Sequence, residues 1–312
     1  MEGGIAMAKR IYGHIEELIG NTPLVDISAL ADGKATILGK VEFFNPGGSA
    51  KDRIAKAILD DAEERGIITP GESTLVESTS GNTGVGLAML AAARGYRLII
   101  TMPENMSVER RNLIAAYGAE LVLTPGSEGI PGANRKAEEL LVQIPGSFAP
   151  GQFTNPVNPL AHYRTTGPEI WADTDGQVDA YVAGVGTGGT LSGAAKYLRE
   201  QNPAVGVFAV EPEESQVLVG GPAAPHGIQG IAGGFIPDTM DMDIVDEVLH
   251  VHTDEAYAFQ RRLSHELGIL VGISSGAAVA AAVALAQRPE FAGKTIVAIL
   301  PDTGERYLSV IS

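Results

Sequence analysis

Short apolar or β-branched segments alternate with helical segments from about residue 72 onward, and Gly, Pro or Asn marks the joins between them. A first series of alternating strands and helices occupies residues 73–78, 84–95, 97–103, 107–118 and 119–125. A second series, which also begins with a strand, occupies residues 179–185, 191–200 and 205–212. Strands that alternate with helices usually pair in parallel, so the pattern predicts an α/β fold of mainly parallel sheets flanked by helices.

The length of 312 residues exceeds one average domain and predicts two. We place a smaller α/β domain at residues 47–158 and build a larger one from residues 1–46 and 159–312. The larger domain contains the clearest amphipathic helix, in which Thr253 is expected as the N-cap and Gly268 as the end. The apolar face of this helix consists of Ala256, Phe259, Leu263 and Leu267.

Composition excludes several classes of protein. The chain has no cysteine, which removes disulfides, zinc–thiolate sites, iron–sulfur clusters and thiol nucleophiles. Its 22 basic and 38 acidic residues give a formal charge of -16, which repels nucleic acid and anionic membranes, and no basic patch is evident. Residues 1–10 lack the pattern of a targeting segment, and no run of about 18 apolar residues occurs. We therefore expect a soluble cytoplasmic protein without nucleic-acid or membrane partners.

A glycine-rich turn precedes Lys51 in the sequence NPGGSAKDR, residues 45–53. Ser49 is a typical N-cap residue, and Ile54 and Ile58 follow at helical spacing, so Lys51 is expected in the first turn of a helix. The helix dipole and burial both disfavour an ammonium there, which leaves a neutral amine able to condense with a carbonyl. The alternative is a lysine beside an ordinary helix start that extends its charge into solvent.

A second glycine-rich loop, GVGTGGTLSG at residues 184–193, follows an expected strand and opens an expected helix. Free N–H groups at a helix start bind phosphate, and Thr187 and Thr190 would add hydroxyls suited to one compact phosphate. The loop also satisfies G-x-G-x-x-G, and Glu211 lies near the distance of a ribose-binding acid, so a dinucleotide site is a rival. A tight turn without a ligand is a third alternative. A P-loop is excluded because the chain has no G-K-[ST].

Two further loops between a strand and a helix carry hydroxyl groups. The sequence STSGNTG at residues 78–84 suits a carboxylate or a phenolic oxygen, unless its hydroxyls only cap their own helix. The sequence GISSG at residues 272–276 matches a nucleophile elbow, but that assignment needs a histidine after the serine, and none follows His265. Ser274 is therefore either a helix cap or a hydrogen-bonding partner for a cofactor.

Two pairs of polar residues suggest a metal or a carboxylate site only weakly. His250 and His252 would project from one face of a strand, but no third metal ligand is evident and we expect no metal. Asp241 and Asp243 are expected in a solvated turn and not as a catalytic pair.

Together, a reactive lysine, a phosphate-binding loop, a polar loop and a hydroxyl at another helix start suit one cofactor, pyridoxal 5'-phosphate. With these motifs the chain resembles the cysteine synthase family, the O-acetylserine sulfhydrylases of the fold type II pyridoxal-phosphate enzymes, whose two-domain fold is tryptophan synthase β-like. The resemblance covers nearly the whole chain. It rests on IGNTPLV, NPGGSAKDR, STSGNTGVGLA, PENMSVERR, GVGTGGTLSG, IQGIAGGFIP, GISSGAA and PDTGERYLS.

The resemblance implies a role for each matched residue. Lys51 would carry the cofactor as an imine and later remove the α-proton of the substrate, and Asn82 would bind the ring hydroxyl. Ser274 would face the pyridine nitrogen, which a neutral hydroxyl cannot keep protonated as an aspartate can. The phosphate would be bound by Gly186, Thr187, Gly188, Gly189 and Thr190. The substrate carboxylate would be bound by Thr79, Ser80, Gly81, Thr83 and Gln152.

The activity implied by the resemblance is that of a cysteine synthase, which converts O-acetyl-L-serine and sulfide to L-cysteine and acetate by β-replacement through an aminoacrylate. We expect the smaller domain to close over the substrate and exclude water. The resemblance also suggests a homodimer and leaves a complex with serine acetyltransferase open. Close relatives use O-phosphoserine, or condense serine with homocysteine to cystathionine. No arginine lies between Arg199 and Arg261, which argues against a donor phosphate.

Four positions depart from the family pattern, in which valine is usual at residue 50, lysine is common at residue 227, and glycine–alanine is usual at residues 232–233. Ala50 is expected to be harmless, whereas Gly227 and Ala232 lie in a glycine-rich stretch that would border the cofactor and bear on donor and acceptor preference.

Two other functions compete with β-replacement. They are a nicotinamide-dependent oxidoreductase that uses the glycine-rich loop, and a binding protein that has lost its activity. The second is disfavoured because every expected catalytic position holds a suitable residue.

Overall fold

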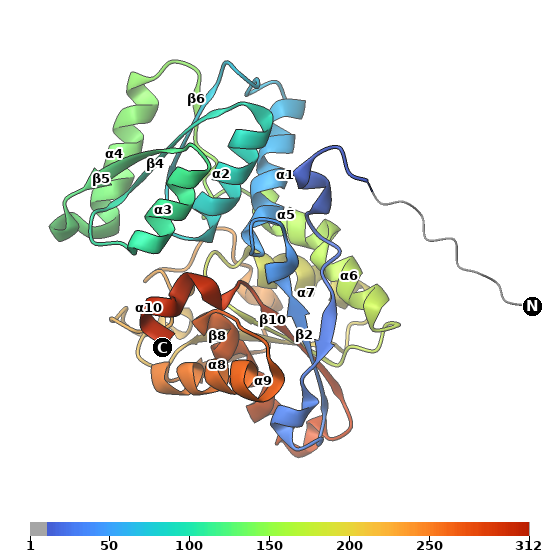
Figure 1. The fold of residues 1–312 in the computed structure, drawn as a ribbon. Coiled ribbons are helices and arrows are strands. Elements are labelled where there is room, and N and C mark those ends of the chain that lie inside the picture. Colours follow the sequence, from blue (N-terminus) through green and yellow to red (C-terminus); the bar gives the residue numbers. More distant parts are fainter. Residues whose placement is uncertain (1–10, 312) are drawn as a thin grey trace, which may run out of the picture.

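The computed structural model describes residues 11–311 and contains two sheets in separate parts of the molecule (Figure 1). Residues 1–10, where we expect no targeting segment, and residue 312 lie outside the described residues. The larger sheet has the order β1-β2-β10-β7-β8-β9, and the smaller has the order β5-β4-β3-β6. All neighbouring strands pair in parallel except β1 with β2. The expected α/β fold of mainly parallel sheets is confirmed.

The elements follow the expected alternation. The strands are β1 (Leu24–Asp26), β2 (Thr36–Val41), β3 (Thr74–Ser78), β4 (Arg97–Pro103), β5 (Glu120–Thr124), β6 (Ser147–Phe148), β7 (Ala180–Gly184), β8 (Gly206–Pro212), β9 (Glu247–Val251) and β10 (Thr295–Leu300). The α-helices are α1 (Lys51–Glu64), α2 (Asn82–Arg94), α3 (Val108–Ala116), α4 (Gly129–Gln143), α5 (Val157–Arg164), α6 (Thr166–Asp173), α7 (Gly189–Gln201), α8 (Thr253–Leu267), α9 (Ile273–Ala286) and α10 (Leu308–Ile311). Of the short 3-10 helices, η3 (Glu42–Phe44), η6 (Met242–Ile244) and η8 (Gly304–Tyr307) matter below.

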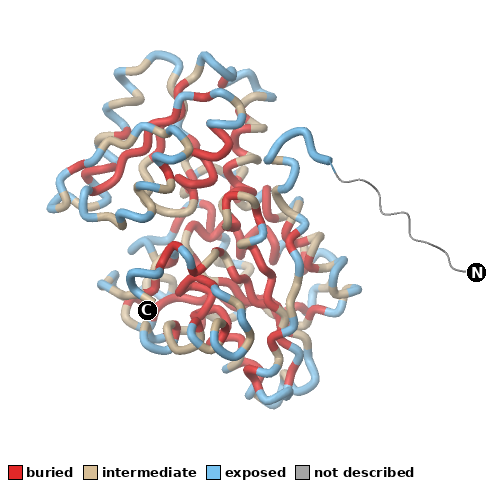
Figure 2. The backbone as a smooth tube through the Cα atoms, viewed as in Figure 1, coloured by how far each residue is buried: buried red, intermediate tan, exposed pale blue. Residues whose placement is uncertain are grey.

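Helices cover both faces of the four-stranded sheet. On one face, Leu75 of β3 belongs to the same buried cluster as Leu87 of α2. On the other face, Val76 and Ile99 pack with Ala137 of α4. A parallel sheet that is covered on both faces needs apolar side chains on both, which explains the neighbouring apolar residues Leu75 and Val76 of β3 and 98–100 of β4, and the buried centre of this sheet (Figure 2).

The six-stranded sheet packs against α9, which is buried along most of its length. This helix lies against β10 and β7 and also against α8, so it is apolar on nearly every side. Its many small residues allow close approach. A side chain on Gly276 would collide with the backbone carbonyl of Ala256 in α8.

Two expected helix caps differ in the structure. The N-cap of α1 is Ala50, and Ser49 instead accepts a hydrogen bond at its Oγ from the N–H of Lys51 (3.2 Å). The N-cap of α8 is His252, and Thr253 is the first helical residue. Gly268 ends α8 in the left-handed conformation with a φ of 71°, as expected.

Among the described residues, no helix has the combination of length and apolar character that crossing a membrane requires.

Candidate active site

A cavity of about 970 Å³ lies where four helices begin. Its wall includes Lys51 and Asn82, the first residues of α1 and α2, Thr190 in the first turn of α7 and Ser274 in the first turn of α9. Each helix N-terminus carries a partial positive charge and unpaired N–H groups. The cavity is therefore suited to an anionic ligand, although the chain as a whole has a formal charge of -16.

The cavity brings together all the site residues expected from sequence except Gly189. Those that line it are Lys51, Thr79, Ser80, Gly81, Asn82, Thr83, Gln152, Gly186, Thr187, Gly188, Thr190 and Ser274. Gly189 is the first residue of α7 and packs against Asn158 instead.

The loop before α7 is close-packed main chain. An added Cβ at Gly186 would lie 2.6 Å from the carbonyl oxygen of Gly230, and one at Gly188, whose φ is +81°, would lie 2.6 Å from Met240 Cβ. At Gly189 an added Cβ would collide with Asn158 Oδ1, a buried oxygen that has no hydrogen-bond partner within residues 11–311. At these three positions only glycine fits, and main chain that runs into a helix N-terminus is the arrangement that binds phosphate.

Lys51 is the first residue of α1, and its half-buried side chain faces the cavity. Burial lowers the pKa of its amine, and the negative charges of Asp302 and Glu42 oppose this shift without cancelling it. The direction agrees with the expectation from sequence. A larger fraction of neutral, nucleophilic amine is present near neutral pH than for an exposed lysine.

The polar loop at residues 78–84 does not use its hydroxyls as a helix cap. The N-cap of α2 is Gly81, which makes no side-chain capping bond. Thr83 Oγ1 donates to Gln152 Oε1 (2.6 Å), and Thr79 Oγ1 accepts from the N–H of Gly81 (3.2 Å). Hydroxyl and amide groups from two parts of the chain thus meet at one wall of the cavity.

Ser274 is not a helix cap either, because the N-cap of α9 is Gly272. Its side chain is buried and lines the cavity. Ser274 is therefore placed where it can contact a ligand in the cavity.

Several lining residues were not identified from sequence, among them Glu77, Arg110, Phe153 and Phe235. Arg110 lies in the motif PENMSVERR, and its guanidinium carbon stands 5.0 Å from the ring centroid of Tyr307. A cationic side chain therefore does line the cavity, from α3 and not from the region between Arg199 and Arg261. The argument against a donor phosphate from the missing arginine loses its force.

Glu77 is a buried carboxyl at the end of β3 that holds the loop before α5. It accepts hydrogen bonds from the N–H groups of Gly151 (3.0 Å) and Gln152 (3.4 Å). Burial raises its pKa to about 7, and these two hydrogen bonds only partly oppose the shift. The one signal for it in the sequence was an acid near the end of a predicted strand.

The pKa of Glu77 predicts a pH effect on stability. Between its ordinary value of 4.5 and about 7, the folded chain holds a proton that the unfolded chain releases, so the free energy of unfolding falls as the pH rises through this interval. Glu77→Gln cannot ionise. Between pH 5 and pH 8, the free energy of unfolding measured in urea should fall for the wild type by on the order of 2–3 kcal/mol more than for Glu77→Gln.

The exposed Glu72 provides a matched control for this measurement, and Glu72→Gln should follow the wild type at each pH. Equal pH dependence of Glu77→Gln and the wild type would show that Glu77 titrates normally.

The remaining polar candidates are engaged elsewhere. His250 Nε2 lies 3.2 Å from Glu211 Oε1, and Glu211 also accepts from the N–H of Leu218 (2.8 Å), so this carboxylate is not presented to the cavity as a ribose ligand. His252 pairs with Glu214. The part of the chain that the structure describes contains no group of three or more residues arranged to hold a metal ion.

The other pair singled out in the sequence forms a turn, as expected. Asp241 caps η6 by accepting from the N–H of Asp243 (3.0 Å).

Two departures from the family pattern have visible local effects. Ala232 adopts the left-handed conformation with a φ of 52°, which glycine adopts without strain. At Gly227, whose N–H donates to Thr253 Oγ1 (3.0 Å), an added Cβ would lie 2.5 Å from Thr253 Cγ2. A lysine at position 227 would therefore require Thr253 to move.

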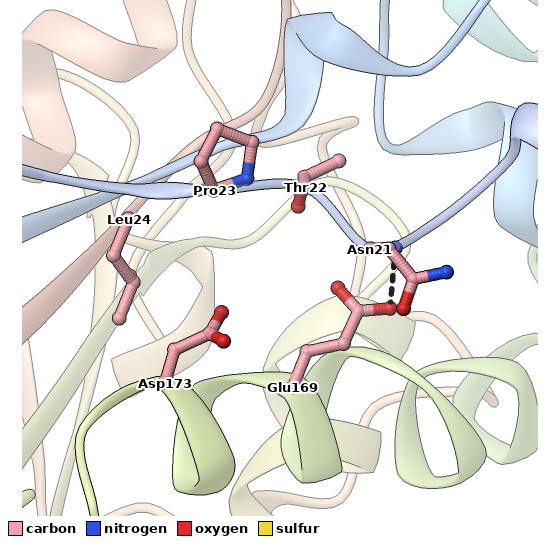
Figure 3. Close-up of a pocket in the computed structure, with 6 residues that line it drawn as sticks. All are labelled: Asn21, Thr22, Pro23, Leu24, Glu169 and Asp173. Carbon is pink, nitrogen blue, oxygen red and sulfur yellow. Dashed lines mark hydrogen bonds between the residues drawn. The ribbon is translucent and has the colours of Figure 1, made fainter. Parts of the chain in front are cut away.

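A smaller cavity of about 340 Å³ lies beside a buried ion cluster (Figure 3). Its wall includes Glu169, whose carboxylate accepts from the N–H of Asn21 (2.9 Å) and is paired with Arg53 (2.7 Å) and Lys40 (2.9 Å). Arg53 also binds the buried Glu42 (2.7 Å). These charges compensate one another within the protein, so the cluster is a structural anchor and the larger cavity is the candidate active site.

Comparisons with known proteins identify the family of this chain. The sequence pattern of the family described as pyridoxal-phosphate dependent enzyme matches residues 15–302. A cysteine synthase of Staphylococcus aureus is 52% identical over 305 residues, which are 97% of each chain.

Two solved structures are similar to this chain in both fold and sequence. A cysteine synthase (OASS) of Entamoeba histolytica has a TM-score of 0.94 and 47% identity over 97% of this chain and 91% of that chain. An O-ureido-L-serine synthase has a TM-score of 0.93 and 46% identity over 96% of this chain and 95% of that chain.

Proposed function

Since the chain belongs to the cysteine synthase family of pyridoxal-phosphate dependent enzymes, we propose that it converts O-acetyl-L-serine and sulfide to L-cysteine and acetate. The observation that carries this proposal is the half-buried amine of Lys51, with its lowered pKa, in one cavity with a glycine-rich loop at the start of α7. The family match decides against the nicotinamide-dependent alternative.

The residues of the cavity fit pyridoxal 5'-phosphate. The phosphate would lie at the start of α7 against the main chain of Gly186, Gly188 and Gly189 and the hydroxyls of Thr187 and Thr190. The ring would lie between Asn82 and Ser274, with its aldehyde held by Lys51. When bound, this group supplies an electron-withdrawing ring that stabilises negative charge at the α-carbon of the substrate.

The other groups of the chain position the substrate and move its proton. Thr79, Ser80, Gly81, Thr83 and Gln152 would receive the substrate carboxylate, in part through N–H groups at the start of α2. Lys51 Nζ accepts the α-proton, which requires the neutral amine that burial favours. The neutral hydroxyl of Ser274 leaves the ring a weaker electron sink than an aspartate would, which favours loss of a β-leaving group. Acetate leaves the β-carbon and sulfide adds to it.

Arg110 bears on the choice of donor. A guanidinium in the cavity wall would suit O-phosphoserine, whose phosphate prefers a cationic partner, and this donor is therefore the second candidate. Serine condensed with homocysteine to cystathionine is a third, because the departures at Gly227 and Ala232 lie near the cavity. O-acetylserine is preferred because the sequence motifs follow the sulfhydrylases nearly throughout.

We further propose that residues 47–158 form the smaller domain, and that it closes over the substrate against residues 1–46 and 159–312. The four-stranded sheet and α1 to α4 fall inside the first range, and cavity residues come from both sides of the division. Small-molecule substrates are the partners that the family implies. A homodimer and a complex with serine acetyltransferase are proposals that rest on the family. A cytoplasmic location is a proposal that rests on the family and on the absence of cysteine.

The donor is tested with purified, cofactor-loaded protein and O-acetylserine, O-phosphoserine or serine in separate reactions with sulfide. Cysteine formation and the change in visible absorbance are followed in each. We expect the highest kcat/KM with O-acetylserine. A response confined to O-phosphoserine would overturn the donor assignment, and a colourless protein without a borohydride-reducible band would overturn the proposed function itself.

A further inference from the structure

The end of β10 and the segment that follows it reach the cavity from the far end of the chain. The N–H of Ala50 donates to the carbonyl of Pro301 (2.9 Å), and the N–H of Gly272 donates to the carbonyl of Asp302 (3.1 Å). Residues 301–307 therefore hold the starts of α1 and α9 in place. This segment contains the motif PDTGERY, to which the assignments above give no role.

Two charged side chains of this segment hold the amide of Asn82. Asn82 Nδ2 donates to Asp302 Oδ2 (2.7 Å), and Arg306 Nη1 donates to Asn82 Oδ1 (2.5 Å). Asp302 also accepts from the hydroxyl of Tyr307, and Arg306 also donates to the carbonyl of Gly47. Asp302 and Arg306 are both buried, so neither exchanges these partners freely with water.

The two charges admit a single orientation of the amide. A carboxylate only accepts hydrogen bonds and a guanidinium only donates them, so the nitrogen of Asn82 must face Asp302 and its oxygen must face Arg306. A flipped amide would place two oxygens together at Asp302 and two donors together at Arg306. The amide nitrogen has two hydrogens, and Asp302 takes one of them, which leaves the other for a ligand in the cavity that Asn82 lines.

We propose that Asp302 and Arg306 are positioning residues that lock the amide of Asn82 with its free N–H toward the cofactor ring. The ring oxygen then meets a hydrogen-bond donor and never the amide carbonyl. This inference rests on the proposed function, which places the ring beside Asn82. Charge-assisted bonds at both ends of the amide are stronger than neutral ones, and they avoid the reorganisation that a freely rotating amide would need.

Asp302→Asn tests the charge with little change of shape. An asparagine at this position can accept or donate and carries no charge, so Arg306 alone then orients the amide of Asn82, and the partner of the bound ring is held less firmly. In the cofactor-loaded variant we expect the induced circular dichroism of the visible band to fall to less than half of the wild-type value. Because supporting residues of this kind typically contribute a factor of 10 to 100, we expect kcat to fall roughly 10- to 100-fold.

Asp179 offers a matched control at the opposite end of β10. Its carboxylate also binds a backbone N–H, that of Thr295 (2.9 Å), and a cation, Lys294 (2.8 Å), but it does not line the cavity. Asp179→Ala should lower stability and leave the visible dichroism of the bound cofactor unchanged. This comparison separates positioning of Asn82 from a general loosening of the strand.

Asp302→Ala and Arg306→Gln should also lower the induced circular dichroism of the visible band. If one of these variants fails to fold, Asp302→Asn provides the test. Wild-type dichroism and kcat in a folded Asp302→Asn variant would overturn the inference. A wild-type protein that binds no pyridoxal phosphate would instead overturn the proposed function, so the two failures are distinguishable.

Discussion

We expect Lys51→Ala to abolish cysteine formation and to leave the fold intact. In the proposed function the variant loses both the attachment point of the cofactor and the group that accepts the α-proton, and a positioned general base alone contributes a factor of about 10² to 10⁴. We expect turnover with O-acetylserine and sulfide to fall by at least about 10³-fold. Borohydride reduction followed by peptide mapping should label the wild-type peptide that contains Lys51 and leave the variant unlabelled.

Stability should change little, because the half-buried amine of Lys51 makes no hydrogen bond or ion pair among the described residues. We expect a difference of roughly 1 kcal/mol or less in the free energy of unfolding of the cofactor-free proteins. Lys56 provides a control on the same helix, where it pairs with Asp60 (2.6 Å). Lys56→Ala should keep wild-type labelling and turnover. Cysteine formation by Lys51→Ala at a wild-type rate would reject the role of this residue.

Arg53→Met has the largest expected effect on stability. Its guanidinium binds the buried Glu42 and also Glu169, and removing it leaves Glu42 without its ion-pair partner and Glu169 paired with Lys40. Burial alone would raise the pKa of Glu42, but the attraction and hydrogen bonds of Arg53 outweigh it and hold that pKa at about 2. Breaking a buried ion pair costs about 3–5 kcal/mol, and we expect a loss of that size in urea unfolding at pH 7.

The sign of the pH dependence supplies a second readout. The low pKa of Glu42 stabilises the wild type above pH 4.5, the ordinary value, and this contribution is lost as the pH falls toward 2. In Arg53→Met the carboxyl of Glu42 protonates more readily. The difference in the free energy of unfolding between the variant and the wild type should therefore become smaller at acid pH. Adding Glu42→Gln to Arg53→Met should recover part of the loss, because it removes the uncompensated charge. Equal stability of Arg53→Met and the wild type at pH 7 would show that the cluster contributes nothing.

Local patterns predicted most of the fold correctly. The alternation of apolar runs and helical segments located β3, α2, β4, α3 and β5 to within a few residues, because in each case short-range periodicity and turn residues agree. The caps of α1 and α8 were wrong, because loop contacts engage the predicted capping residues elsewhere. Ser49 forms an isolated bridge with Asp302, and Thr253 binds the N–H of Gly227.

The residues that support the site were beyond the reach of sequence patterns. Asn82 and Asp302 are 220 positions apart, and Glu77 is 74 positions from Gly151, so no local spacing connects either pair. The motifs that hold Lys51, Asn82 and the glycine-rich loop were found because each is a contiguous loop at a helix start, whose chemistry follows from its own residues. Contacts that are set by tertiary packing can be identified only once the fold is known.

The pairing of β2 with β10 links assembly of the site to the order of synthesis. Residues Thr36–Val41 lie between β1 and a strand at Thr295–Leu300, and Pro301 holds the backbone just before Lys51. Until the strand at residues 295–300 has been synthesised, one edge of β2 lacks its partner, and the N–H of Ala50 lacks the carbonyl of Pro301 that accepts from it. We therefore expect β2 and the start of α1 to reach their final arrangement late in cotranslational folding.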